Sequence, residues 1–159
     1  MQELISKIEQ WAIDRELDKK ATVEAQSIKT AEEMAELIIG ISKDNLEVIK
    51  DSIGDVFVTL VVGNMIYFNF NMEKILSRVL KFFDAPPKVE LIHDISLNIN
   101  NIVYKKYMDS TISLTIMCLL MVCNTYDLDF IDCVESAYNE IKDRKGKTID
   151  GQFIKESDL

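Results

Sequence analysis

Residues 26–41 read QSIKTAEEMAELIIGI, and residues 53–68 read IGDVFVTLVVGNMIYF. In the first stretch, spacings of three, seven and ten positions bring the polar side chains to one narrow stripe of a helix. The stripe consists of Gln26, Lys29, Glu33 and Glu36, with Glu32 and Gly40 beside it. The second stretch is apolar on nearly all sides, which is typical of a buried helix. The two stretches therefore predict α-helices that pack into a core.

Length and composition favour a single all-α domain. The chain has 159 residues, of which 48% are hydrophobic, and this is enough for one domain with a substantial core. Five glycines and two prolines provide few turns, which argues against a sandwich or barrel of many short strands. We therefore expect one helical domain over residues 1–159.

The pattern of apolar residues predicts six helices and one further helical segment. The expected helices are Gln2–Leu17, Val23–Ser42, Asn45–Phe70, Lys88–Tyr107, Ser110–Thr125 and Asp129–Asp143, and the further segment is Met72–Phe83. Pro86 and Pro87 separate the segment from the next helix, because proline cannot continue a helix. Gly146 is expected to stop the last helix and to leave residues 144–159 as a polar, basic tail.

Charge and cysteine usage exclude several classes of protein. The net charge of -9 disfavours stable binding to nucleic acid. The three cysteines Cys118, Cys123 and Cys133 lie in or beside apolar runs without zinc-ligand spacing, which suits reduced core thiols in the cytoplasm. Residues 1–20 carry charges throughout, and the apolar runs are shorter than the ~20 residues of a membrane span. We expect neither a signal peptide nor membrane insertion.

A weak internal repeat relates the two halves of the chain. Shifting the sequence by 56 positions aligns residues 59–75 with residues 115–131, and most pairs keep their apolar character. In this alignment Val89 and Ile92 stand opposite Glu33 and Glu36, and Thr111 stands opposite Asp55. Either the chain consists of an acidic half, about residues 1–83, and a degenerate half, about residues 88–143, or two buried helices merely share a composition.

The acidic residues of the first half predict a metal site. Asp55 lies within an apolar helix, four positions after Asp51, and a buried carboxylate needs a cation or a hydrogen-bond network. Antiparallel packing would bring both aspartates opposite Glu33 and Glu36, and Lys29 alone cannot neutralise four acids. Carboxylate oxygens of this kind suit Mg²⁺. In the alternative interpretation, the glutamates form a solvated face and Asp55 pairs with a lysine.

The segment 138-YNEIKDRKGK gathers basic residues near the end of the last predicted helix. Basic side chains at this position complement the helix dipole. They would equally suit the binding of phosphate groups.

Taken together, these residues resemble the MazG-like, all-α nucleotide pyrophosphohydrolases, in particular the small versions encoded by bacteriophages. The resemblance covers most of the chain and rests on 11-WAIDR, the pattern Q-x-x-K-x-x-E-E-x-x-E-L at 26–37, 50-KDSIGDVFVTL and 138-YNEIKDRKGKTIDGQF. It implies a helical bundle that hydrolyses (deoxy)nucleoside triphosphates to the monophosphate and pyrophosphate with Mg²⁺ or Mn²⁺. It also implies a homo-oligomer, a dimer or tetramer, in the cytoplasm, which for a phage protein is that of the host.

The resemblance also assigns roles to individual residues. The metal ligands would be Glu33, Glu36 and Asp55, with Asp51 in place of the family's glutamate, which is Ser52 in this chain. Glu32 or Asp51 would position the attacking water. Contacts to substrate would come from Gln26, Lys29, Asn139, Lys142, Arg144 and Lys147. Trp11 is a candidate for stacking on a base, although an aromatic residue on an apolar helix face is more often part of the core.

Besides a purely structural bundle, which would show no metal-dependent stabilisation, two other functions remain open at this stage. One is an enzyme restricted to dUTP or dCTP, since no base-reading pocket is identifiable from the sequence. The other is an inactive helical module that binds a nucleotide or a protein, because the acid expected at position 52 is a serine.

Overall fold

The computed structural model describes residues 1–81 and 83–158, and in this part of the chain it has eight α-helices and one small antiparallel hairpin. The elements are α1 (Gln2–Asp14), α2 (Leu17–Lys20), α3 (Val23–Ser42), α4 (Leu46–Ile66), α5 (Met72–Val79), α6 (Lys88–Lys105), α7 (Asp109–Tyr126), α8 (Phe130–Ile141), β1 (Gly146–Ile149) and β2 (Gln152–Lys155), followed by a 3-10 turn, Glu156–Asp158. The predicted all-α class is confirmed.

Polar side chains fix the starts of four helices. Thr22, Asn45, Asn71 and Asp129 each accept a hydrogen bond from the backbone N–H three residues further along. This contact satisfies one of the N–H groups that a helix start leaves without a partner. The starts of α3, α4, α5 and α8 are therefore encoded locally in the sequence.

Within residues 1–83, three predicted boundaries differ from the structure by more than one residue. The first helix breaks at Glu16, whose positive φ of 58° separates α1 from α2. The helix predicted to reach Phe70 ends at Ile66, because the side chain of Asn64 pairs with the backbone N–H and C=O of Phe70 and turns the chain. The segment predicted to reach Phe83 ends at Val79, and Phe82 lies outside the described residues.

The prediction of a polar tail after residue 143 is wrong. The last helix ends at Ile141, and Gly146 begins a strand instead of stopping a helix. β1 and β2 pair antiparallel from Gly146↔Lys155 to Ile149↔Gln152. The sequence pattern missed the hairpin because each strand has only four residues. Its Asp150-Gly151 turn uses positive φ angles at both positions, which matches the twist of paired strands.

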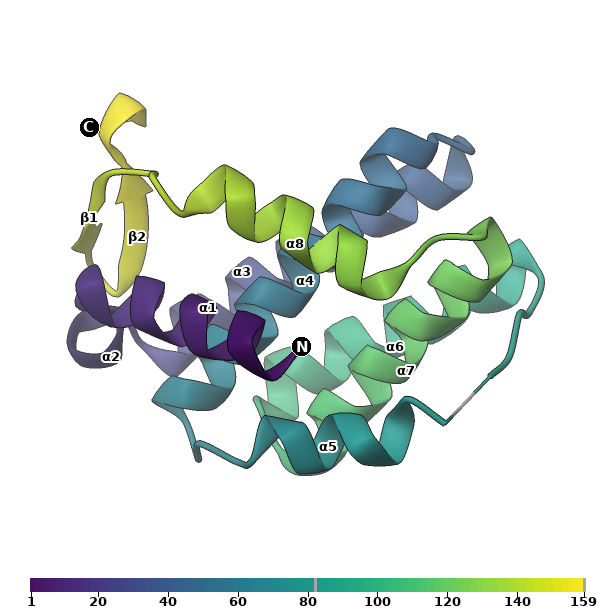
Figure 1. Cartoon of the computed structure of the whole chain (residues 1–159), viewed down its shortest axis with the longest axis horizontal. Helices are drawn as coiled ribbons and strands as arrows, with labels where there is room; N and C mark the ends of the chain where they lie inside the picture. The colour runs from purple at the N-terminus through teal and green to yellow at the C-terminus, as the bar shows by residue number, and fades with distance from the viewer. Residues whose placement is uncertain (82, 159) are drawn as a thin grey trace.

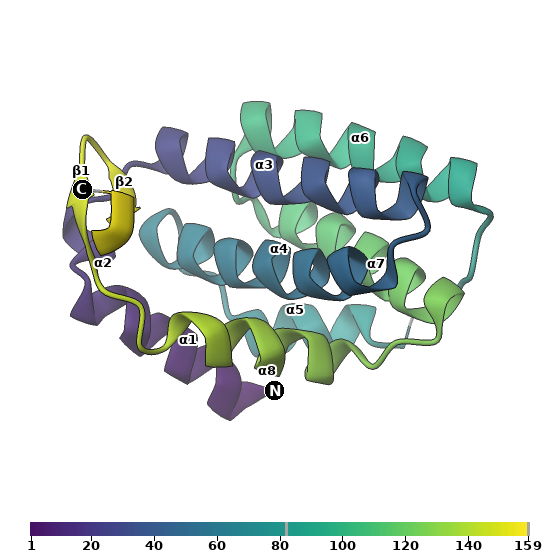
Figure 2. The ribbon, with the colours of Figure 1, turned by 90° about the horizontal axis from the view of Figure 1, so that it is seen from above.

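The helices surround one continuous apolar core. α3 and α6 lie side by side along one side of the molecule, and α1 and α8 lie along the opposite side (Figure 2). α4 packs between them and contacts α3 and α8, and the hairpin lies at one end, beside α1 and α2 (Figure 1). Phe57, Leu60 and Val61 of α4 are completely buried. α4 is thus the central helix, as its uniformly apolar sequence predicts.

Among the described residues, no single helix has the length and apolar character to cross a membrane. α7 and α8 reach that length and composition only as a pair, and they are bent by 109° at the break between them.

The two halves of the molecule have the same order of elements. The hairpin of α3 and α4 is followed by the short helix α5, and the hairpin of α6 and α7 is followed by α8. α8 packs on α4, while α5 packs on α7. The last helix of each half therefore covers the pair of antiparallel helices of the other half. This exchange is compatible with a pseudo-twofold axis between the halves, and the duplication of the sequence stays a prediction.

Candidate functional site

A cavity of about 360 Å³ lies between α3, α4, the end of α8, α1 and the hairpin. Six carboxylates and three cationic side chains line it, with apolar residues at one end. The charged residues are Glu32, Glu33, Glu36, Asp51, Asp55, Glu140, Lys29, Arg144 and Lys155. All five acids selected from the sequence are among them. The structure thus brings the predicted acids together around one space.

The cavity has an acidic end and an apolar end because α3 and α4 run in opposite directions. Glu36 near the end of α3 lies opposite Asp51 near the start of α4. Towards the other end, Ala25 of α3 lies opposite Val62 of α4. At 1.5 Å per residue, the wall from Ala25 to Glu36 is about 16 Å long. The cavity is therefore an elongated groove with different chemistry at its two ends.

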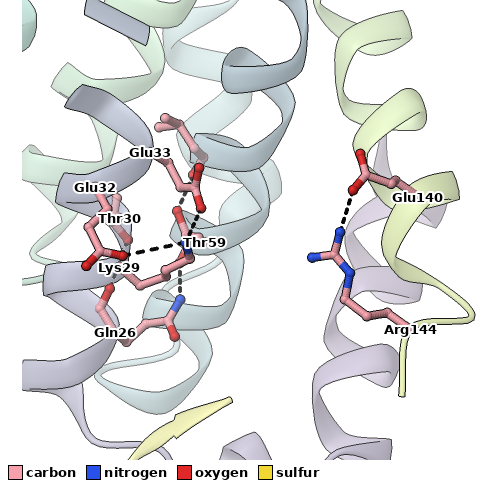
Figure 3. A network of polar contacts seen from close by, with 9 residues as sticks. Gln26, Lys29, Thr30, Glu32, Glu33, Thr59, Glu140 and Arg144 are labelled. Carbon is pink, nitrogen blue, oxygen red and sulfur yellow. Dashed lines mark hydrogen bonds and ion pairs between the residues drawn. The ribbon is translucent and has the colours of Figure 1, made fainter. Parts of the chain in front are cut away.

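The two cations nearest the acids are already paired. Lys29 Nζ lies 2.6 Å from a carboxylate oxygen of Glu33 and 3.5 Å from one of Glu32. On the opposite wall, Arg144 pairs with Glu140 (Figure 3). Burial alone would lower the pKa of Lys29, but its pairing with Glu33 and Glu32 raises that pKa overall. Neither cation is left to neutralise the aspartates of α4.

The excess of carboxylates over unpaired cations affects the pKa of Asp55 most strongly. Burial, together with the negative charges of Glu33 and Asp51, raises the pKa of Asp55 to about 7. Glu140 acts in the same direction, and the charge of Arg144 opposes it. Burial and the neighbouring acids also raise the pKa of Asp51. The lysine partner of Asp55 that the alternative interpretation required is not found among the described residues.

The donor chemistry of the acidic end fits a hard divalent cation. Glu33, Glu36, Asp51 and Asp55 supply only carboxylate oxygens, which Mg²⁺ and Mn²⁺ prefer. Among the described residues, however, no three acids, histidines or cysteines stand close enough to form a finished metal cluster. Glu33 is turned towards Lys29 instead. Carboxylates that are not paired with a cation repel one another, which favours their separation.

Asp51 and Asp55 are the two acids of α4 that line the cavity, whereas Ser52, next to Asp51, does not line it. Ser52 is 3% exposed and faces the core, whereas Asp51 is exposed and lines the cavity one turn before Asp55. Asp51 is close enough to Asp55 to raise its pKa. The geometry therefore supports Asp51, and not position 52, as the second acid of this helix.

The predicted substrate-binding residues divide into two groups. Gln26, Lys29, Arg144 and Trp11 line the cavity. Asn139, Lys142 and Lys147 do not: Lys142 donates a hydrogen bond to Asn139 on the outer face of α8, and Lys147 lies in a second, smaller depression beside Arg15. Asn139 lies on an exposed face of α8 beside Glu140, and Lys142 and Lys147 follow the end of that helix at Ile141.

Trp11 is largely a core residue, as is usual for an aromatic side chain on the apolar face of a helix. Its side chain is 9% exposed, its indole N–H donates to the carbonyl oxygen of Ile141, and the guanidinium of Arg15 lies 4.6 Å from its ring centre. Phe153 contacts the same indole in a T-shaped arrangement. These contacts leave little of the indole free for a ligand.

Among the charged and aromatic residues that line the cavity, three were missed in the sequence: Glu140, Phe153 and Lys155. Glu140 follows the selected Asn139 directly, but only the orientation of α8 shows which of the two faces the groove. Phe153 and Lys155 lie on β2, in the segment expected to be a tail; the Asp150-Gly151 dipeptide, which is typical of a hairpin turn, is the sequence signal that points to this strand.

Comparisons with known proteins give one partial relationship. The "Uncharacterized 18.2 kDa protein in rep-hol intergenic region" of Haemophilus phage HP1 (strain HP1c1) is 52% identical over 62 residues. The match covers 39% of this chain and 38% of that protein, so the aligned part is well under half of the relative's length. No family model matches the chain. No solved structure matches it. The relationship therefore connects part of the chain to a bacteriophage protein whose name states no activity.

Proposed function

We propose that this protein is a MazG-like pyrophosphohydrolase that converts (deoxy)nucleoside triphosphates to monophosphates and pyrophosphate with Mg²⁺ or Mn²⁺, in the cytoplasm of a phage-infected host. The observation that carries the proposal is the excess of carboxylates in one groove, with Asp55 held at a pKa of about 7 among other acids. An acidic groove repels a free triphosphate, so a divalent cation is needed to join the two. The resemblance of the sequence motifs supports the same reaction.

Each group of cavity residues has a role in this proposal. Glu33, Glu36, Asp51 and Asp55 would hold the cation, which when bound supplies positive charge to the phosphate oxygens and acidifies water. Lys29 and Arg144 would leave their carboxylate partners and bind the phosphate chain, since both suit phosphate oxygens. Glu32, on the exposed edge of the groove, would orient the attacking water and accept its proton.

The reaction is tested by measuring pyrophosphate release from a panel of dNTPs and NTPs, with and without Mg²⁺. The matched variants are Glu36→Gln, which lies in the groove, and Glu24→Gln, which lies exposed on the same helix outside it. We expect Mg²⁺-dependent release from the wild type and from Glu24→Gln. Glu36→Gln should lower kcat/KM by about 100-fold or more, because it removes a charged metal ligand.

The same measurement separates the alternatives. Release from dUTP or dCTP alone would identify the restricted enzyme. A folded protein that releases pyrophosphate from no triphosphate, in the presence of either metal, would contradict the proposal and leave the binding module. A Glu36→Gln variant as active as Glu24→Gln would show that the activity belongs to another site.

A further inference from the structure

The apolar end of the groove is built in part by the C-terminal hairpin. Leu17, Ala25, Val58 and Val62 form its helical walls, and Phe153 of β2 closes it. Apolar side chains with an aromatic ring at one end of a charged groove are typical of a site for a flat, apolar ligand group. Lys29 and Arg144 lie between this end and the acids, where the charged part of such a ligand would be bound.

Several contacts hold the hairpin in place. The backbone N–H of Thr22 donates a hydrogen bond to the carbonyl oxygen of Gly151. The hydroxyl of Thr148 donates one to the carbonyl oxygen of Arg15. Arg15 in turn donates to the carbonyl oxygens of Lys142 and Arg144. The chain between α8 and β1 is thus tied to the end of α1. Phe153 is therefore a fixed wall of the groove and not part of a loose tail.

Two glycines permit this placement. A side chain at Gly146 would come within 2.6 Å of the Phe153 ring and 2.2 Å of the carbonyl oxygen of Ile154. Gly151 has a φ of +84°, and a side chain there would come within 2.8 Å of the Thr22 hydroxyl. The Phe153 ring can lie across β1 only because position 146 has no side chain.

The ring of Phe153 has more exposed surface than the indole of Trp11. Trp11 is held by Arg15, by the carbonyl oxygen of Ile141 and by Phe153 itself. Phe153 is only partly buried and lines the same space. The aromatic surface available to a ligand at this end is therefore that of Phe153.

From these contacts we infer that Phe153 is a specificity-determining residue that packs against the base of a nucleoside triphosphate, with the phosphates directed towards Lys29 and the acids. This inference rests on the proposed function for the identity of the ligand. It assigns the C-terminal hairpin a direct part in substrate binding. A ligand that has phosphates but no base should not respond to Phe153.

The test compares Phe153→Ala with Ile149→Ala, an exposed apolar residue on the other strand that does not line the groove. Steady-state kinetics with dNTPs should show KM raised about tenfold or more for Phe153→Ala, with kcat changed far less, because stacking on a base contributes to binding. Inhibition by inorganic tripolyphosphate, which has no base, should be equal in both variants and the wild type. Gly146→Ala should resemble Phe153→Ala.

A binding measurement makes the test independent of turnover. Trp11 is the only tryptophan of the chain and contacts Phe153, so its fluorescence reports on this end of the groove. Titration with an α,β-methylene dNTP and Mg²⁺ should change this fluorescence in the wild type and in Ile149→Ala, with weaker binding in Phe153→Ala. Tripolyphosphate should bind all three proteins equally, by calorimetry.

The outcomes distinguish the two proposals. Equal KM values and equal analogue affinities in Phe153→Ala and Ile149→Ala would overturn the inference while the hydrolysis stands. Analogue binding that depends on Phe153, without pyrophosphate release, would support the inference and contradict the proposed reaction. Absence of analogue binding to the folded wild type, by fluorescence and by calorimetry, would overturn both.

Discussion

Asp55 shows how a single residue determines the properties of the groove. Its helix is buried, and its nearest cations are occupied by Glu33 and Glu140. The charged form of Asp55 is therefore unfavourable in the folded protein, and its pKa rises to about 7. Such a group favours either a proton or a divalent cation, and the pH decides which one binds.

This pKa predicts the effect of pH on stability. Between pH ~4 and ~7 the folded protein binds more protons at Asp55 than the unfolded protein, so stability falls as pH rises through this window. Above pH 7 the full destabilisation is present, at most about 4 kcal/mol. Asp55→Asn should therefore stabilise the protein in metal-free buffer, and more at pH 8 than at pH 5.

Urea denaturation at the two pH values measures this difference. Asp18→Asn, an exposed aspartate on α2 outside the groove, is the matched control and should change the free energy of unfolding little at either pH. A pH profile for Asp55→Asn that runs parallel to that of the wild type would contradict the role of Asp55.

At the scale of elements, the contact between α4 and α8 positions both walls of the groove. α4 carries Asp51 and Asp55, and α8 carries Glu140. The two helices approach closely at Gly54, where a side chain would come within 2.4 Å of the Cys133 carbonyl oxygen and 2.6 Å of Ala137 Cβ. A glycine at this position therefore sets the width of the groove.

Gly54→Ala should force the helices apart. Overpacking of this kind costs about 1–3 kcal/mol, and a lower midpoint of thermal unfolding should accompany lower kcat/KM, because Glu140 and Arg144 move away from α4. Gly40→Ala is the control, since a side chain there meets Ile49 and Val48 at 3.1 Å, a milder contact. Equal unfolding temperatures for the two variants would show that α8 adapts without strain.

At the scale of the whole molecule, the two halves differ in charge although their elements correspond. The acids of the groove come from α3, α4 and α8, whereas the aligned positions on α6 and α7 hold Val89, Ile92 and Thr111. The first half therefore provides five of the six carboxylates, and Glu140 of α8 is the sixth; the second half also packs α6 against α3 and α8 against α4. The association of this chain with further copies stays a prediction.

The charge of the groove predicts that divalent cations stabilise the whole molecule. At a concentration 100 times its dissociation constant, a cation that binds only the folded state adds about 2.7 kcal/mol. For a chain of this size that raises the midpoint of thermal unfolding by roughly 5–10 °C. The shift should be larger at pH 8 than at pH 6, because Asp55 is then deprotonated.

Differential scanning calorimetry with MgCl₂, and with NaCl at matched ionic strength as the control, measures this effect. Asp55→Asn should lose most of the Mg²⁺-specific shift. If MgCl₂ and NaCl raised the midpoint of thermal unfolding of the wild type equally at pH 8, charge screening alone would explain the effect. That result would contradict specific binding of a divalent cation in the groove.

The amino-acid sequence by itself determined the helical class, the starts of α3, α4, α5 and α8, the central place of α4, and the five acids of the groove. These are local or periodic properties: capping side chains precede the helices, and spacings of three and four positions bring residues to one face. Asp55 was identifiable because it interrupts an apolar helix.

Only the tertiary structure decided which side chains meet across the groove. It turned Asn139, Lys142 and Lys147 away, brought in Glu140, and folded the expected tail into the hairpin that carries Phe153 and Lys155. These outcomes depend on where α8 ends and on what Arg15, Thr22 and Gly146 allow the following chain to contact. The contacts of Arg15 and Thr22 join residues more than a hundred positions apart, and no local spacing in the sequence encodes them.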